Sequence, residues 1–348
     1  MLVQIGTGAD STRQHILHLA AEHNLLASVM DSGEGGQVIS VGGSLEDDIA
    51  SLPDVLRVVM KHRPFAMASL EARGRSTVTV GSVVIGGKRP VMIAGPCSVE
   101  GRDAIIGQAR LAQAAGANLL RGGAFKPRTS PYSFQGHGEL GLQMLADARE
   151  ATGLPVVTEV MEPDQVELVS SYADMLQIGS RNMANFSLLK ACGRSSKPVL
   201  LKRGFSATLE EFLMSAEYIM AHGNPNVVLC ERGIRTADAA FRFNLDLNIV
   251  PGVRAVSHLP IIVDPSHGTG RRELVHRMAL AGIAAGADGL AIEIHPDPDN
   301  AMSDGMQTIT PTELQRIIHR VAALSAVLAA TEDELLDITP LASIEASA

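Results

Sequence analysis

The segments Val199-Leu-Leu-Lys-Arg-Gly204 and Val227-Val-Leu-Cys-Glu-Arg-Gly233 share one pattern, a short apolar run followed by charged residues and a glycine. Nearly continuous apolar runs of this length are typical of parallel strands that are buried on both faces. Eight such runs alternate with helical stretches from residue 90 onward, at 91–94, 118–121, 156–160, 175–178, 199–202, 227–231, 261–264 and 289–294. Eight strand–helix units in about 240 residues predict a (β/α)8 TIM barrel. An open doubly wound sheet is the alternative, but no G-x-G-x-x-G follows the first run.

The first 63 residues predict a small separate domain. A strand at 2–6, a helix at 11–23, strands at 25–30 and 37–41, a helix at 45–52 and a strand at 55–61 give the order βαββαβ of a ferredoxin-like fold. Residues 64–75 are expected to form a linker. The barrel domain is then expected over 76–324, with a β-hairpin at 77–85 that turns at Gly81 and Ser82, and a C-terminal tail over 325–348.

Composition excludes several classes of protein. The chain has 348 residues, 29 Lys plus Arg against 38 Asp plus Glu, no Trp, 3 Tyr and 8 Phe. A net charge of -9 and so few aromatic residues argue against a nucleic-acid partner. The 3 cysteines lie far apart, so we expect no disulfide framework and a reducing cytoplasm. No apolar stretch is long enough to span a membrane, and no membrane partner is expected.

Polar residues follow the ends of the apolar runs. A single charge at a strand end is ordinarily a solvated loop residue, but ionisable groups follow seven of the eight runs and a thiol follows the first. The carboxyl ends of barrel strands meet at one mouth, so these side chains are expected to converge. Cations form the larger subset, at Arg121, Lys126, Arg128, Arg181, Lys202 and Arg232. Because like charges repel, such a cluster predicts a ligand rich in phosphate and carboxylate.

A second subset contains metal-binding side chains. Cys97, His267, Glu293 and Asp304 follow different strands and could together hold one divalent ion, with softer first-row metals favoured by the thiolate. Their long-range spacing leaves an alternative open, in which Cys97 is a small buried residue and His267 contacts a phosphate.

The other two cysteines are expected to have no role in a metal site. Cys192 lies in the helical stretch 186–193 and is expected to pack there. Cys230 immediately precedes Glu231 on a strand, so its side chain is expected to face the surrounding helices.

Five motifs resemble those of 3-deoxy-D-arabino-heptulosonate 7-phosphate (DAHP) synthases. They are Gly95-Pro-Cys-Ser-Val-Glu100, Arg121-Gly-Gly-Ala-Phe-Lys-Pro-Arg-Thr-Ser130, Leu201-Lys-Arg-Gly204, Cys230-Glu-Arg-Gly-Ile-Arg235 and Ser257-His-Leu-Pro-Ile-Ile-Val-Asp-Pro-Ser-His-Gly268. The resemblance covers roughly residues 76 to 322. Residues 1–63 are similar in layout to the ferredoxin-like extension of the type I-beta branch.

The resemblance implies the first step of the shikimate pathway, in which phosphoenolpyruvate condenses with erythrose 4-phosphate and water, and phosphate leaves. It implies that Arg121, Arg181, Lys202 and Arg232 hold phosphoenolpyruvate, with Lys126 reaching toward the reacting carbons. Pro127, Arg128 and Thr129 match the aldose phosphate site, and Ser180 matches a backbone contact. Cys97, His267, Glu293 and Asp304 match the ligands of a divalent metal, which could be Mn2+, Fe2+, Zn2+ or Co2+.

The expected catalytic groups are Lys126, Glu159 and His267, with Asp264 orienting His267. The sequence does not decide whether Lys126 or Glu159 moves the proton. Two departures from the family pattern are Ser180, where Ala is usual, and Met306, where Pro is usual near Asp304.

Two rival interpretations are considered. A 3-deoxy-D-manno-octulosonate 8-phosphate synthase shares the barrel and phosphoenolpyruvate, but Lys126-Pro-Arg-Thr-Ser130 replaces the Ala-Asn-Arg-Thr-Ser usual in that enzyme. A regulatory protein with an inactive barrel is disfavoured because the metal and substrate positions are intact. The resemblance further implies a homotetramer and feedback inhibition by an aromatic amino acid through residues 1–63.

Overall fold

A computed structural model describes residues 1–33, 35–43, 45–59, 63–127, 130, 132–238 and 240–335. Eight parallel strands close into a barrel in the order β10-β11-β12-β13-β14-β7-β8-β9, which confirms the predicted (β/α)8 architecture. The barrel strands are β7 (Val91–Gly95), β8 (Leu119–Arg121), β9 (Val156–Glu159), β10 (Met175–Ile178), β11 (Val199–Lys202), β12 (Val227–Glu231), β13 (Ile261–Val263) and β14 (Gly289–Glu293). Pairing of Gly289 on β14 with Val91 on β7 closes the ring.

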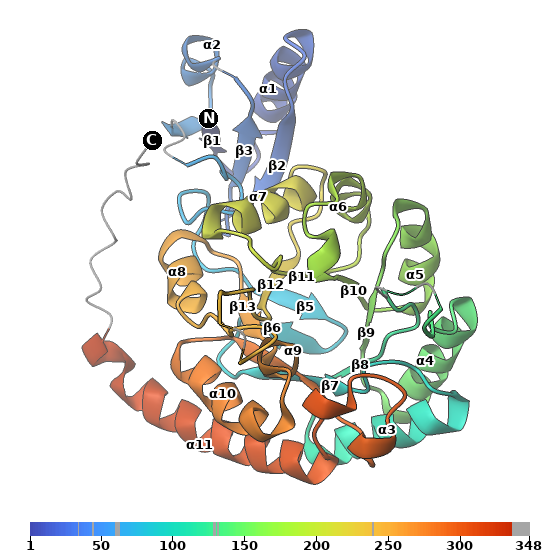
Figure 1. Ribbon diagram of the computed structural model, residues 1–348. Helices are drawn as coiled ribbons and strands as arrows, with labels where there is room; N and C mark the ends of the chain where they lie inside the picture. The colour runs from blue at the N-terminus through green and yellow to red at the C-terminus, as the bar shows by residue number, and fades with distance from the viewer. Residues whose placement is uncertain are drawn as a thin grey trace.

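Helices surround the barrel (Figure 1). They are α3 (Arg102–Ala115), α4 (Glu139–Thr152), α5 (Val166–Tyr172), α6 (Phe186–Gly193), α7 (Leu209–Met220), α8 (Ile249–Val256), α9 (Pro265–Thr269), α10 (Arg272–Ala284) and α11 (Pro311–Leu335). Short 3-10 turns lie at Pro163–Gln165, Ser180–Asn182, Pro298–Asn300 and Gly305–Gln307. Local sequence sets the helix ends. Thr208 and Glu211 form a reciprocal capping box at the start of α7, and Gly116 ends α3 at a φ of 100° that favours glycine.

Alternate residues of the barrel strands fill the interior. Ile93, Leu119, Leu200 and Ile262 belong to one buried cluster, together with Val78, Val80 and Ile85 from the hairpin β5 (Val78–Val80) and β6 (Val83–Ile85). Cys230 also belongs to this interior cluster, so the expectation that it faces the helices is wrong. The neighbouring Glu231 instead points outward and pairs with Arg203. Both faces of β12 are buried, and burial alone therefore did not reveal which residue faces inward.

The N-terminal residues form a four-stranded antiparallel sheet in the order β2-β3-β1-β4. Its elements are β1 (Leu2–Ile5), α1 (Asp10–Glu22), β2 (Ala27–Asp31), β3 (Gln37–Val41), α2 (Glu46–Ala50) and β4 (Val55–Val59), in the predicted order βαββαβ. One face, with Val3 and Ile39, packs on the two helices. The other face places Leu2 and Met30 in the large cluster that also contains the barrel's outer layer. In Figure 1 this sheet and its helices project beyond α7.

The segment that joins the sheet to the barrel is held by buried polar contacts. The carboxylate of Glu217, on α7, accepts hydrogen bonds from the backbone N–H groups of Met67 and Ala68, both at 2.9 Å. His258 Nε2 lies 2.7 Å from the carbonyl oxygen of Met67. Ser28 of β2 donates a hydrogen bond of 2.6 Å to the carbonyl oxygen of Ala221, directly after α7. The sheet and the joining segment are therefore anchored to the same side of the barrel.

The last helix is longer than expected. The sequence placed a tail from residue 325, but α11 continues without a break to Leu335. No glycine or proline interrupts residues 312–335, so nothing in the sequence ends the helix at 324. Among the helices of the described residues, none is long and apolar enough to cross a membrane.

Candidate functional site

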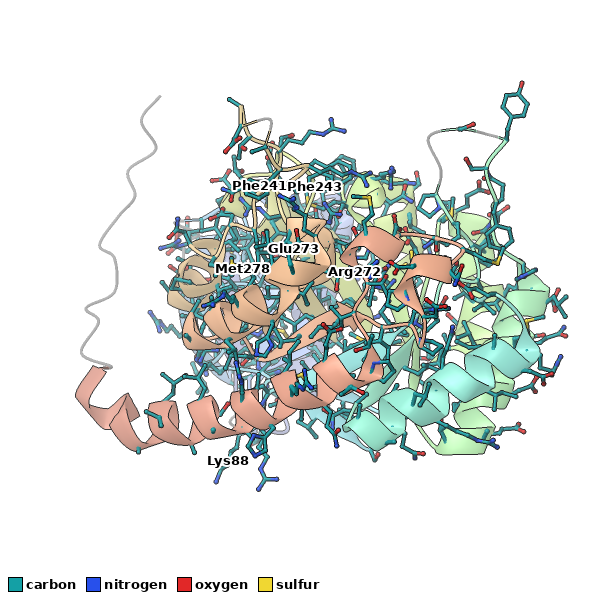
Figure 2. All side chains as sticks on the ribbon, turned by 60° about the horizontal axis from the view of Figure 1, so that its bottom comes forward. Lys88, Phe241, Phe243, Arg272, Glu273 and Met278 are labelled. Atoms are coloured by element: carbon teal, nitrogen blue, oxygen red, sulfur yellow. The ribbon has the colours of Figure 1, made fainter. Side chains whose placement is uncertain are left out.

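A cavity of about 350 Å³ opens where the barrel strands end. In Figure 2, Phe243, which lines this cavity, lies at the opposite end of the molecule from Lys88, which follows the hairpin. The cavity wall contains Arg121, Lys126, Arg181, Lys202 and Arg232, five of the six cations that the sequence singled out. Pro127, Glu159, Ser180, His267 and Asp304 also line it. Arg128 and Thr129 lie outside the described residues.

The strand alternation that fills the barrel interior also directs cations into this cavity. Arg121 follows Leu119 at the end of β8, and Lys202 follows Leu200 at the end of β11, each two residues beyond an interior side chain. Both cations are buried and paired. Arg121 Nη1 lies 3.0 Å from Glu293 Oε1, and Lys202 Nζ lies 2.6 Å from Asp264 Oδ2.

Arg121 nevertheless keeps free donors. It forms an ion pair with Glu293, but neither Arg121 Nη1 nor Glu293 Oε1 makes a hydrogen bond, and Arg121 Nε is also without an acceptor. Buried polar atoms are normally satisfied. These donors are therefore available to an anion in the cavity, and the Glu293 oxygen is available to a cation.

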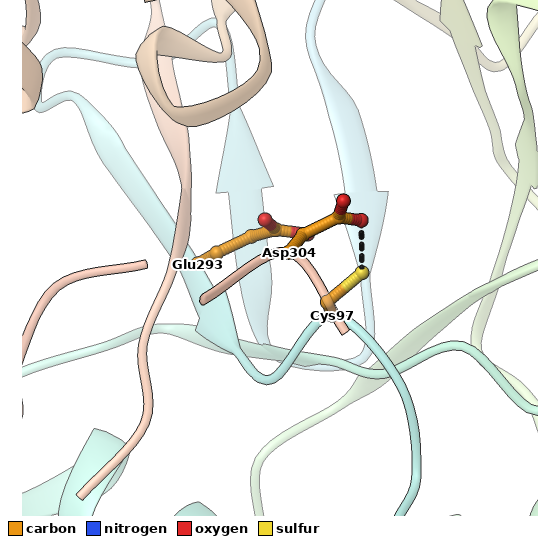
Figure 3. A group of neighbouring side chains, drawn as sticks. All are labelled: Cys97, Glu293 and Asp304. Carbon is orange, nitrogen blue, oxygen red and sulfur yellow. Dashed lines mark hydrogen bonds between the residues drawn. The ribbon is translucent and has the colours of Figure 1, made fainter. Parts of the chain in front are cut away.

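Three side chains that could bind a metal meet next to the cavity, which one of them, Asp304, lines (Figure 3). Ligand atoms of Cys97, Glu293 and Asp304 all lie within 4.8 Å of one another. The Cys97 thiol donates a 2.9 Å hydrogen bond to Asp304 Oδ2, and Gln307 Nε2 donates one of 2.6 Å to Glu293 Oε2. Asp304 has a left-handed backbone with φ of 53°, which is uncommon outside glycine and often marks a functional site.

His267 approaches the same group through Glu293. Its Nε2 lies 3.4 Å from Glu293 Oε1, while its Nδ1 lies 2.7 Å from Asp264 Oδ2. Burial lowers the pKa of His267 and outweighs the opposing effects of Asp264 and Glu293, so the ring is neutral at pH 7. In the tautomer that donates from Nδ1 to Asp264, the Nε2 lone pair faces Glu293. His267 Nε2 and Glu293 Oε1 thus both present lone pairs to the same space, and such a pair of atoms is suited to binding a cation.

Asp264 organises the residues behind the cavity. Burial disfavours its charge, but its close contacts with the His267 ring and the Lys202 ammonium outweigh burial and hold its pKa well below the usual range. One carboxylate oxygen also caps α9 by accepting from the backbone N–H of His267 at 3.0 Å. Asp264 thereby fixes both the backbone and the ring of His267 and also holds Lys202.

Cys97 lies in an environment with opposing charges. Burial and then Glu293 raise the pKa of its thiol to about 12, whereas Lys126 and Arg121 lower it. Lys126 Nζ lies 2.9 Å from Cys97 Sγ. The thiol therefore keeps its proton at neutral pH unless a further positive charge enters the group, as happens when a metal binds.

Glu159 is part of the cavity wall and is held there by a neighbouring side chain. Its Oε2 accepts a 3.2 Å hydrogen bond from Gln177 Nε2, and a Cβ at Gly179 would lie 2.1 Å from its Oε1. Gly179 is also the residue before the 3-10 turn that presents Ser180 and Arg181. The position of Glu159 thus depends on a glycine that leaves room for its carboxylate.

Several cavity residues were missed by the sequence analysis. Gln177 and Gln307 hydrogen-bond the two glutamates, and Phe205, Arg242 and Phe243 form part of the wall. Gln177 lies on the fourth barrel strand, two residues after Met175, so its inward orientation followed from the alternation. Phe205, Arg242 and Phe243 lie in loops, where no strand alternation indicates which way a side chain points.

Known proteins resemble this chain over most of its length. The model of the DAHP synthetase I family matches residues 67–329. The phospho-2-dehydro-3-deoxyheptonate aldolase of Thermotoga maritima is 44% identical over 334 residues, which cover 94% of this chain and 98% of that protein. The 2-dehydro-3-deoxyphosphooctonate aldolase of Magnetococcus marinus is 32% identical and covers 72% of this chain and 93% of its own.

Solved structures agree in fold. The crystal structure of the Thermotoga maritima DAHP synthase superimposes with a TM-score of 0.75 at 43% identity, covering 94% of this chain and 97% of that one. A truncated form of the Thermotoga enzyme gives a TM-score of 0.71 at 45% identity and covers 76% of this chain and 97% of its own. The family match and these identities show that the chain belongs to the DAHP synthetase I family.

Proposed function

We propose that the chain condenses phosphoenolpyruvate with erythrose 4-phosphate and water to form 3-deoxy-D-arabino-heptulosonate 7-phosphate and phosphate, the first step of the shikimate pathway. One observation carries this proposal. Cations suited to phosphate and carboxylate line a single cavity together with Asp304, and Asp304 belongs to the possible metal-binding group with Cys97 and Glu293. The reaction needs this combination, because both substrates are phosphorylated and one carbonyl must be activated.

The cations would bind and orient the two substrates. Arg121 has unsatisfied donors, and Lys202, Arg181 and Arg232 line the same cavity. Guanidinium groups bind phosphate and carboxylate oxygens in a bidentate manner. The positive charges offset the repulsion between the two anionic substrates. Holding both substrates in one site also converts a bimolecular encounter into a reaction within one complex.

Cys97, Glu293 and Asp304 would hold a divalent ion, with His267 as the fourth ligand through Nε2. The fit is supported by Glu293 Oε1, a buried oxygen without a hydrogen bond, and by the neutral ring of His267 facing it. A bound divalent ion would supply Lewis acidity for the aldehyde carbonyl. The thiolate favours the softer first-row ions, such as Zn2+ and Co2+, and the carboxylates also accept Mn2+ or Fe2+.

Proton handling would fall to Lys126 and Glu159, which both line the cavity. Lys126 already contacts the Cys97 thiol and carbonyl at 2.9 and 3.0 Å, so its ammonium is oriented before substrate binds. Glu159 is oriented by Gln177. Pro127 and Ser180 would shape the wall for the second phosphate and for a backbone contact, respectively.

The rival activity uses arabinose 5-phosphate and gives an octulosonate. The relative with a heptonate name is similar over 94% of the chain, whereas the Magnetococcus protein with an octonate name is similar over 72%. Phosphate release should therefore be measured with each sugar phosphate, with and without EDTA. Release with erythrose 4-phosphate alone, lost with EDTA and restored by a divalent ion, is expected. Release with arabinose 5-phosphate alone would favour the rival, and no release with either sugar would refute both.

The N-terminal sheet would act as a regulatory domain that responds to an aromatic amino acid, in a homo-oligomer of four chains. The sheet is well placed to influence the barrel because Ser28 contacts the residue after α7, and the joining segment contacts α7 itself. Inhibition by Tyr, Phe and Trp should be tested on the full chain and on one that lacks residues 1–63. Insensitivity of the full chain to all three would refute this role, and light scattering would give the number of chains.

A further inference from the structure

Two phenylalanines form a stacked pair in the wall of the cavity. Phe205 lies in the loop after β11, and Phe243 lies in the loop after β12. Their ring centroids are 5.1 Å apart and the rings are tilted by 19°. Phe243 is only 5% exposed, although the adjacent Arg242 is exposed. The pair therefore bridges two loops that both contribute to the cavity.

Four guanidinium groups lie over these two rings. Arg181, Arg232 and Arg235 lie 5.8, 5.1 and 5.2 Å from the centroid of Phe205, and Arg232 and Arg242 lie 4.2 and 5.2 Å from that of Phe243. Cations are attracted to the negative face of an aromatic ring. The four like charges repel one another, so their common location favours binding of an anion between them.

Arg232 differs from the other cations of the cavity. It is 6% exposed, whereas Arg181, Arg235 and Arg242 are exposed. Burial lowers its pKa, because the charged form loses hydration. Arg121 and Lys202 each face a buried carboxylate, but within the described part of the chain Arg232 forms no ion pair. Its hydrogen bond, from Nη1 to the carbonyl oxygen of Gly233, is long at 3.5 Å.

Support by a ring has a different consequence from support by a carboxylate. A carboxylate would neutralise the guanidinium and would compete with an anionic substrate for its N–H groups. A ring contacts the face of the guanidinium and leaves the N–H groups at its edge free. Phe243, with its centroid 4.2 Å from Arg232 Cζ, therefore orients this charge without occupying its donors.

The two loops are fixed independently of any ligand. Buried Arg203 contacts Glu231 Oε2 at 3.0 Å and Asp246 Oδ2 at 2.8 Å, and it donates to the carbonyl oxygen of Ala207 at 2.9 Å. These contacts tie the loop of Phe205 to the loop of Phe243. The stacked pair is thus prearranged by the protein and does not need substrate to form.

We propose that Phe205 and Phe243 are positioning residues that hold the guanidinium of Arg232 for the phosphate group of phosphoenolpyruvate. The identity of this anion rests on the proposed function, whereas the positioning of Arg232 rests on the geometry of the pair. Phe243 makes the closer contact and is therefore the better residue to change.

The test compares three variants of the full chain. Phe243→Leu removes the ring face, and we expect the KM for phosphoenolpyruvate to rise about tenfold, equivalent to about 1.4 kcal/mol. The kcat and the KM for erythrose 4-phosphate should stay within about twofold, because uniform binding of one substrate is lost. Phe243→Tyr keeps the ring and should retain the wild-type KM. Phe241→Leu, at a 41% exposed site in the same loop, is the matched control and should also behave as wild type.

Several outcomes would overturn the proposal. An unchanged KM for phosphoenolpyruvate in folded Phe243→Leu would overturn it. An equal rise in the KM for phosphoenolpyruvate and the KM for erythrose 4-phosphate would also overturn it. So would a rise in the KM for phosphoenolpyruvate in Phe243→Tyr as large as that in Phe243→Leu. Calorimetry with phosphoenolpyruvate alone separates this test from the proposed function, because weaker binding to Phe243→Leu is expected even if the wild-type chain releases no phosphate. A wild-type chain that binds neither phosphoenolpyruvate nor inorganic phosphate would overturn the role of Arg232 as an anion ligand.

Discussion

Lys126 Nζ lies 2.9 Å from Cys97 Sγ, close enough for the ammonium to stabilise the thiolate. Lys126 lowers the pKa of Cys97, against burial and Glu293, which raise it to about 12. A metal must displace the thiol proton, so loss of this ammonium should weaken metal binding. We expect Lys126→Met to bind Zn2+ or Mn2+ roughly 10- to 100-fold more weakly at neutral pH, as is typical when a supporting partner of a metal ligand is lost.

Competition with a chelator at fixed pH measures this affinity without reference to catalysis. Lys126→Arg keeps the positive charge and should lose much less affinity. Equal affinities for Lys126→Met and the wild type would show that the ammonium does not assist the thiolate.

The three buried cysteines provide a direct test of the metal group. Cys97→Ala should abolish stoichiometric metal binding and lower kcat by more than about 100-fold, beyond the loss expected for a residue that only supports a ligand. Cys192→Ala is the matched control, because Cys192 is also buried but lies on α6 and does not belong to the group of Cys97, Glu293 and Asp304. It should cost about 1 kcal/mol of stability and leave kcat unchanged. Full activity and bound metal in Cys97→Ala would refute the assignment.

Gly179 tests the placement of Glu159. A Cβ at Gly179 would lie 2.1 Å from Glu159 Oε1, so Gly179→Ala must displace the carboxylate. Its φ of -70° is open to alanine, which leaves crowding as the only defect. We expect kcat to fall by about 10- to 100-fold, in the lower range for general acid–base groups. Gly107→Ala, in α3 with nothing within 4 Å of the new Cβ, should keep wild-type kcat. Equal activity of the two variants would show that Glu159 has no role in catalysis.

The barrel could be read from the sequence because each strand is buried on both faces and its composition shows this directly. The same property hid the orientation of the strands. Cys230 and Glu231 are both fully buried, and only the packing of Cys230 in the interior and of Glu231 against Arg203 tells them apart. A charged residue was assumed to face the mouth, whereas the inward position belongs to Arg232.

Part of the candidate site could also be predicted, because several of its residues lie at the ends of barrel strands. Cys97, His267 and Glu293 follow or end strands, so the fold alone brings them to one mouth. Phe205 and Phe243 lie in loops, and their stacking depends on contacts between segments far apart in sequence. Such pairs leave no periodic pattern. Arg128 and Thr129, expected at the aldose phosphate, lie outside the described residues.

We expect the titration of His258 to make the folded protein less stable in acid. Its ring lies 2.7 Å from the Met67 carbonyl through Nε2 and 2.8 Å from Ser76 Oγ through Nδ1, with the charge of Arg73 nearby. Burial lowers its pKa from 6.5 to about 4. Between these values the unfolded chain binds a proton that the folded chain does not, so the free energy of unfolding falls as the pH falls. The contribution is fully present above about pH 6.5 and is lost toward pH 4.

The expected loss from His258 between pH 7 and pH 5 is about 2 kcal/mol. Urea denaturation at the two pH values should be compared for the wild type and His258→Gln, which keeps a donor and an acceptor but does not titrate. Burial also lowers the pKa of His267, so the wild type alone would not separate the two groups. The variant should be less stable at pH 7 and should lose about 2 kcal/mol less on acidification. Parallel pH dependence of the two proteins would show that His258 does not couple the joining segment to pH.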